Sequence, residues 1–163
     1  MIRYNEIRKA VVTGLKDYLG APVIRTNQTA PAPPYPFVSY TVTTVASTNN
    51  GTWQESHRDG IDRKLVRNIW SITAQSDDGT ESVTLANKAR EWLEHTGRTW
   101  LKDRGITVQS TTDITNRDNI LTVEYEYKNG FDVVFYAFDE VRHPSTDYIE
   151  SAELTREYNK EER

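Results

Sequence analysis

Few residues in this sequence are placed where they could carry out a reaction. His57 lies close to Asp59 and Asp62 in a polar stretch, and such a combination can bind a metal ion or exchange protons. A metal site needs several converging ligands and hydrogen bonds that hold them in place. The sequence HRDGID is more typical of a solvated loop, so we predict no metal site and no cofactor.

Two carboxylates also have a spacing that suggests chemistry. Glu124 and Glu126 share one face of an expected strand, as the catalytic pair of a glycosidase could. Their alternation with Val123, Tyr125 and Tyr127 favours a solvated or interface-facing polar row instead. The sequence contains no nucleophile elbow, phosphate-binding loop, zinc-protease motif or dinucleotide-binding motif. We therefore predict that the protein is not an enzyme, and a small hydrolase is the alternative from that class.

Composition narrows the remaining classes. The 163 residues suffice for one domain with a core, and the absence of cysteine excludes disulfides and thiolate zinc sites. We expect no membrane span and no signal peptide, because no long apolar run is present. The net charge is −4, without the basic surplus of proteins that grip DNA. With 36% hydrophobic residues, nine tyrosines and four tryptophans, some aromatic residues are expected to serve contacts between chains.

Two helices are predicted from apolar residues that recur every three or four positions. The first covers residues 5–19, with Asn5 as N-cap and Gly20 after its end. Gly14 within its apolar stripe either weakens this helix or allows another backbone to approach closely. The second covers residues 80–95 and follows a turn rich in capping groups. A short turn after it is expected to seat Trp100.

Alternating residues predict the first strands. Residues 37–45 and 64–75 are expected to pair antiparallel, and residues 23–26 to form an edge strand. The proline-rich stretch between residues 27 and 36 is interpreted as a stiff connector rather than as a docking ligand. Residues 106–114 form a polar strand that belongs at an edge or facing a lumen.

A long polar loop over residues 46–63 connects the predicted antiparallel pair, and such loops are uncommon unless they are functional or disordered. Trp53 is its one large aromatic residue, and two interpretations stay open for it: an interface anchor, or a side chain that folds back onto its own sheet. The loop is our candidate for contact with a partner structure, through Asn49, Asn50, Trp53, His57, Arg58 and Asp59.

The stretch from residue 116 to residue 141 is the richest in strand-forming residues. We predict a hairpin of strands 120–127 and 131–141 joined at Asn129-Gly130, because this pair suits a tight turn. The second strand is apolar on both faces, so one face should meet helices and the other a neighbouring subunit. The residues assigned to that contact are Phe131, Val133, Phe135 and Tyr136.

The polar cluster Asn116, Arg117 and Asp118 lies between two expected strands, and it has two interpretations. The Asn and Asp side chains could hold a turn. Alternatively, Arg117 could form a bidentate ion pair across a subunit boundary, and we include all three residues in the candidate interface.

The expected fold class is α+β: a mainly antiparallel sheet of four to five strands with two helices packed on one face. Two distant blocks then add a resemblance. IRTNQ at residues 24–28 followed by PPYPFV at 33–38, and NRDN at 116–119 followed by VEYEY and GFDV, resemble phage neck or tail terminator proteins. The resemblance covers residues 1–142 as one tail-terminator-like domain. Residues 143–163 are expected to form a C-terminal arm, in which Ile149 and Leu154 could pin it to an adjacent chain.

The resemblance implies a structural virion protein of the tail or neck, assembled in the host cytoplasm. It implies a homo-oligomeric ring, usually of six copies, that caps the tail tube, ends its growth and joins it to the head connector. The implied partners are the tail tube, the sheath where there is one, and the neck proteins, with DNA passing through the lumen without specific binding and no membrane involved. The alternative is another head–tail joining protein or a baseplate adaptor.

Overall fold

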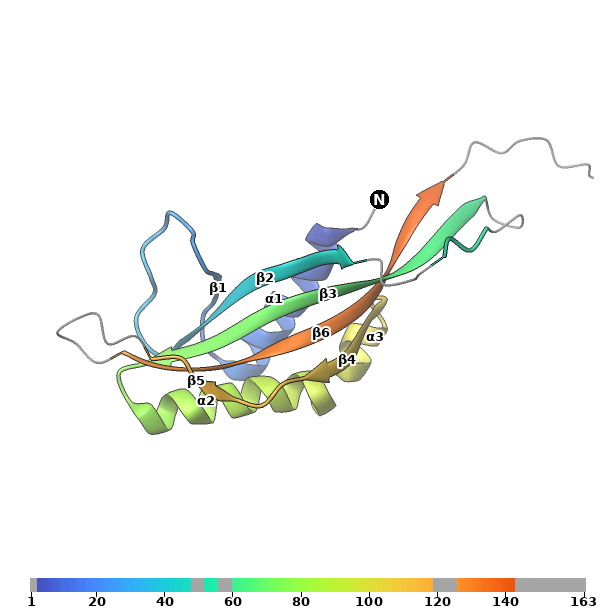
Figure 1. Cartoon of the computed structure of the whole chain (residues 1–163). Coiled ribbons are helices and arrows are strands. Elements are labelled where there is room, and N and C mark those ends of the chain that lie inside the picture. Colours follow the sequence, from blue (N-terminus) through green and yellow to red (C-terminus); the bar gives the residue numbers. More distant parts are fainter. Residues whose placement is uncertain (1–2, 48–51, 56–59, 119–125, 143–163) are drawn as a thin grey trace, which may run out of the picture.

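A six-stranded sheet is the centre of the computed structural model, which describes residues 3–47, 52–55, 60–118 and 126–142 (Figure 1). The order of the main strands is β1-β2-β3-β6-β4, and the short β5 pairs with β6. β1 runs parallel to β2, and the other pairs are antiparallel. The α+β class is confirmed, with six strands in place of the expected four to five. The strands are β1 Val23–Arg25, β2 Phe37–Ser47, β3 Ile61–Ser76, β4 Ile106–Thr111, β5 Thr115–Asn116 and β6 Tyr127–Arg142.

The helices pack on one face of this sheet, as the sequence predicts. They are α1 Tyr4–Leu19, α2 Gly79–Glu91, the π-helical turn η1 Trp92–Thr96 and α3 Arg98–Lys102. Gly20 ends α1 in the left-handed conformation, with φ of 63°. The predicted N-cap was wrong: Arg3 holds that position, and Asn5 lies inside the helix. Asp78 caps α2, where its carboxylate accepts a hydrogen bond of 2.8 Å from the backbone N–H of Glu81.

The core lies between the helices and the inward side chains of the sheet. Alternation along β3 buries one set of residues, as expected from its sequence pattern. Trp70 is the largest fully buried side chain, and its ring contacts those of Tyr4, Tyr40 and Phe135. α1 is thereby joined to three neighbouring strands. The buried β3 residues are Val66, Asn68, Trp70, Ile72, Ala74 and Ser76.

Two glycines make room for one indole ring in the helix layer. The ring of Trp92 lies so close to Gly14 of α1 and to Gly97 that a methyl group at either position would overlap it. The close approach expected at Gly14 is therefore made by a side chain rather than by another backbone. The described residues include no helix that is long and apolar enough to cross a membrane.

The predicted Asn129-Gly130 turn was wrong. Both residues lie inside β6, where Asn129 pairs with Ala74 and Gly130 with Thr73. A Cβ at Gly130 would lie 2.5 Å from the carbonyl oxygen of Ile72, so glycine serves a close backbone approach here. Most of the first strand of that expected hairpin falls in residues 119–125, outside the described residues.

β3 and β6 pair along their whole lengths, from Ile61 with Arg142 to Ser76 with Tyr127. Toward the start of β3, the pairing of β2 with β3 ends at Arg67, and β4 pairs only with residues 133–137 of β6. Residues 61–65 and 138–142 therefore extend past the rest of the sheet as a two-stranded ribbon (Figure 1). We call this part the β3–β6 ribbon.

Candidate subunit and partner interfaces

The face of the sheet opposite the helices carries an apolar patch. Residues that pair directly across two strands share a face, and Val66 with Ala137 lies on the buried one. The next pair, Leu65 with Phe138, therefore lies on the outer face, and these side chains are 46% and 49% exposed. We call the apolar residues of this face the outer patch; they are Leu65, Ile69, Val134, Tyr136 and Phe138.

The structure divides the β6 residues that the sequence assigned to a subunit contact. Phe131, Val133 and Phe135 are fully buried in the core of their own chain, under the helices. This part of the assignment is corrected, because these side chains are not available to a second chain. Tyr136 lies on the outer face, between Arg67 of β3 and Thr107 of β4. The two apolar faces of β6 are thus one core face and one partly exposed face.

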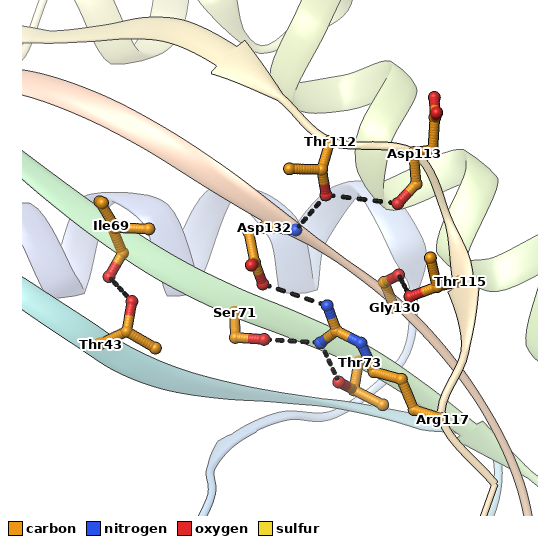
Figure 2. Close-up of polar contacts among 10 residues, drawn as sticks. All are labelled: Thr43, Ile69, Ser71, Thr73, Thr112, Asp113, Thr115, Arg117, Gly130 and Asp132. Carbon is orange, nitrogen blue, oxygen red and sulfur yellow. Dashed lines mark hydrogen bonds and ion pairs between the residues drawn. The ribbon is translucent and has the colours of Figure 1, made fainter.

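Arg117 crosses the outer face from the segment that follows β5 (Figure 2). Its Nη1 donates hydrogen bonds to Ser71 Oγ at 2.5 Å and Thr73 Oγ1 at 3.1 Å, and its Nη2 lies 3.1 Å from Asp132 Oδ1. A Cβ at Gly130 would lie 2.9 Å from Nη1, so the glycine also leaves space for the guanidinium. Arg117 therefore ties this segment to β3 and β6 within one chain.

The neighbours of Arg117 form a local turn. Asn116 Nδ2 donates to Asp118 Oδ2 at 2.8 Å, and the backbone N–H of Asp118 donates to Asn116 Oδ1 at 2.7 Å. Asp118 Oδ1 also accepts a hydrogen bond of 2.6 Å from the backbone N–H of Lys128. The interpretation as a turn held by Asn and Asp side chains fits this geometry. The ionic partner of Arg117 among the described residues, Asp132, belongs to the same chain.

Because its guanidinium makes three contacts on the sheet, Arg117 should contribute measurably to stability. We expect Arg117→Ala to lower the free energy of unfolding by about 1–3 kcal/mol, since the carboxylate and hydroxyl partners lose a shared donor. Urea unfolding followed by tryptophan fluorescence measures this change. Arg90→Ala is the matched control, because Arg90 forms an exposed helix pair with Glu94 worth about 0.5 kcal/mol. Equal losses in both variants would contradict the role of Arg117.

The long loop before β3 is described at residues 52–55. Trp53 is 39% exposed, and the Nζ atom of Lys64 lies 5.9 Å from the centroid of its ring. Gln54 exchanges two backbone hydrogen bonds of 2.8 and 3.1 Å with Arg63. Trp53 therefore lies beside its own β3 with part of its side chain exposed, and its role as an interface anchor stays a prediction. The other loop residues assigned to a partner contact, Asn49, Asn50, His57, Arg58 and Asp59, lie outside the described residues, as do Ile149 and Leu154.

Within the described residues, no group of three or more His, Cys, Asp or Glu side chains could hold a metal ion. Glu126 forms an ion pair of 2.6 Å with Lys128 Nζ and accepts a hydrogen bond of 2.9 Å from the Tyr35 hydroxyl. The hydrogen bond from Thr111 lowers the pKa of Glu94, with a further contribution from Arg90. Burial raises the pKa of Tyr4. These groups take part in local contacts and do not converge on one cleft.

The two edges of the sheet differ in how far they are covered. β1 pairs with β2 only at Val38–Tyr40, so residues 41–46 of β2 have no strand on that side within the described part of the chain. β4 forms the opposite edge of the sheet. Backbone N–H and C=O groups along such edges can pair with another strand.

A groove along α1 was not predicted from the sequence. Its largest hollow, of about 570 Å³, lies between α1 and α3, where Trp100 and Arg104 face Lys9 and Thr13. A hollow of about 250 Å³ shares Arg3 and Arg104 with it and extends to Phe138 and Glu140 at the start of the β3–β6 ribbon. A third, of about 190 Å³, shares Trp100 and extends to Tyr18. We call the three hollows together the α1–α3 groove.

One signal in the sequence could have indicated the groove. Leu101 is fully buried, so the adjacent Trp100 must face away from the core, and it is 37% exposed. The Arg104 guanidinium carbon lies 3.2 Å from the centroid of its ring. An exposed tryptophan stacked with an arginine four residues later, in the turn that follows the same short helix, is a combination typical of interfaces.

Comparison with known protein families gives a match over almost the whole chain. The profile of a family described as phage neck terminator protein matches residues 9–162. No curated protein matches the chain.

Proposed function

Since the chain belongs to the phage neck terminator protein family, and is therefore a structural protein of the phage neck or tail, we propose that its copies close into a ring on the tail tube. The ring, which we take to be a hexamer, ends the growth of the tube and offers a surface to the head connector. It is assembled in the host cytoplasm. A chain that forms such a ring needs exposed apolar or strand-edge surfaces that a neighbouring copy can cover.

The observation that carries the proposal is the unequal completion of the sheet. Helices cover one face, while the other face presents the outer patch, with Leu65 and Phe138 each nearly half exposed. The edges at β2 and β4 are different surfaces of one sheet. A contact between two different surfaces is heterologous, and its repetition closes into a ring when the rotation fits. The outer patch and these edges are our proposed subunit interface.

The contacts with other virion proteins are proposed at the ends of this sheet. The loop around Trp53, with residues 49–60, is placed against the tail tube or the connector, and a sheath protein could be a further partner. Each copy carries a net charge of −4, which adds up over the copies of a ring. An acidic lumen repels the DNA backbone, so the genome can pass without binding.

Inactivating this protein in the phage tests the proposal directly. We expect particles with overlong tails, because tube subunits continue to add when nothing caps the tube. Electron microscopy of lysates measures the length distribution of the tails, and supplying the intact protein from a plasmid is the control. Empty heads beside free tails of normal length would instead indicate another head–tail joining protein. A purified protein that stays monomeric by light scattering, with normal virions in its absence, would overturn the structural proposal.

A further inference from the structure

The α1–α3 groove has the features of a peptide-binding surface. Its central hollow combines an exposed indole, Trp100, with the stacked guanidinium of Arg104. The two outer hollows continue it along α1, from Arg3 at one end to Tyr18 at the other. Tryptophan and arginine are the residues that most often contribute large binding energies at interfaces.

We propose that the α1–α3 groove receives residues 147–154 from the C-terminal segment of a neighbouring copy, an inference that rests on the proposed ring. The assignment is based on the apolar side chains and the length of the segment. Charge does not distinguish it, because the hollows along the first half of α1 are lined by three basic side chains, Arg3, Lys9 and Arg104, and by three acidic ones, Glu6, Asp103 and Glu140.

The segment brings apolar side chains to the exposed aromatic residues. Tyr148, Ile149 and Leu154 are its large apolar residues, and an extended chain would place Tyr148 and Leu154 on one face, toward the groove. From Arg3 to Tyr18 the helix rises by roughly 22 Å, at about 1.5 Å per residue. Eight extended residues span roughly 26 Å. The length of residues 147–154 therefore matches the length of the groove.

The direction of β6 favours a neighbouring copy over the chain's own groove. β6 ends at Arg142, at the far end of the β3–β6 ribbon, which points away from the helices (Figure 1). Glu140 lines the near end of the groove on the same chain. To bind the groove of its own copy, the chain would have to reverse direction within residues 143–146. In the proposed arrangement, residues 147–154 instead bind the groove of the next copy.

Disulfide trapping in the full-length protein tests this contact, because the chain contains no cysteine of its own. Thr13→Cys places a thiol in the groove, and Ala152→Cys places one in the C-terminal segment. The two single variants are mixed during assembly, oxidised mildly and separated on a non-reducing gel. We expect a disulfide-linked dimer, with a yield about tenfold above the control, because docking raises the local thiol concentration. Val83→Cys mixed with Ala152→Cys is the control, since Val83 is exposed on α2 and does not line the groove.

The outcomes separate this inference from the proposed ring. Rings that form without the Thr13–Ala152 crosslink, or with equal crosslinking to Val83, overturn the groove contact and leave the ring standing. A protein that never assembles and forms no crosslink overturns both. A chain that carries both Thr13→Cys and Ala152→Cys shows whether the segment binds its own copy or the next one. Disulfide-linked oligomers on the gel support binding to the next copy, whereas a disulfide within a single chain overturns it.

Discussion

Leu65→Glu should abolish assembly of the proposed ring while the single chain still folds. Leu65 is 46% exposed on the outer face, opposite Phe138, so a carboxylate there stays hydrated in a free copy. Arg63 and Arg67 lie two residues before and after Leu65, and their positive charges would offset part of the new negative charge in a free copy. Between copies the same carboxylate would be buried against apolar side chains, which costs several kcal/mol. We expect each contact to weaken by about a hundredfold, as measured by sedimentation velocity and light scattering.

A second exposed apolar residue provides the matched control. Val83 is 42% exposed on α2, on the helix side of the molecule, and lies outside the outer patch. Val83→Glu introduces the same charge and should leave assembly unchanged. Phe138→Ala should weaken assembly less than Leu65→Glu, because it removes apolar area without burying a charge. If Leu65→Glu assembles as well as Val83→Glu does, the outer patch is not a subunit contact.

The elements that could be predicted from the sequence are those with a periodic pattern that the tertiary structure reinforces. In α1, Ile7, Val11 and Leu15 recur at helical spacing and are all buried against the sheet. In β3, alternation with a period of two matches the buried set that includes Trp70 and Ile72. Such patterns indicate which face of a helix or strand is buried, and burial of that face is what stabilises these elements.

The error at Asn129-Gly130 has a physical cause. A local turn propensity competes with pairing along a whole strand, and all sixteen residues of β6 are paired in register with β3. The glycine is required by contacts with Ile72 and Arg117, which are distant in the sequence. No local pattern reports such contacts, so the same dipeptide could indicate either a turn or a close approach.

The candidate interface shows the same limit. The sequence identified β6 as apolar on both faces but could not say which face the helices would cover. Phe135 therefore appeared as interface although it is core, whereas Tyr136 was assigned to an outer face that exists. The groove at Trp100 depends on α1 and α3 meeting in space, about ninety residues apart along the chain. Its residues could be found only once the fold was known.

Trp70→Ala should be among the most destabilising substitutions in the chain. Trp70 is fully buried, and its ring lies 5.1 Å from that of Tyr40, 5.5 Å from Phe135 and 6.5 Å from Tyr4, measured between centroids. Removing a buried tryptophan costs about 3–5 kcal/mol because it leaves a cavity. That is a large share of a total stability of about 5–15 kcal/mol. We expect the melting temperature to fall by about 10 °C or more, as measured by circular dichroism.

Two further variants serve as controls. One removes an exposed tryptophan, and the other keeps an aromatic ring at position 70 but removes the indole N–H. Trp53→Ala removes an exposed tryptophan whose contact with Lys64 is worth about 0.5–1 kcal/mol, so it should change stability little. Trp70→Phe keeps a ring in the core and removes an N–H that is buried without a hydrogen-bond partner among the described residues. Because that N–H contributes nothing to offset its desolvation, Trp70→Phe should cost much less than Trp70→Ala. A loss for Trp70→Phe as large as for Trp70→Ala would mean that the N–H is bonded after all, and that packing does not dominate at this position.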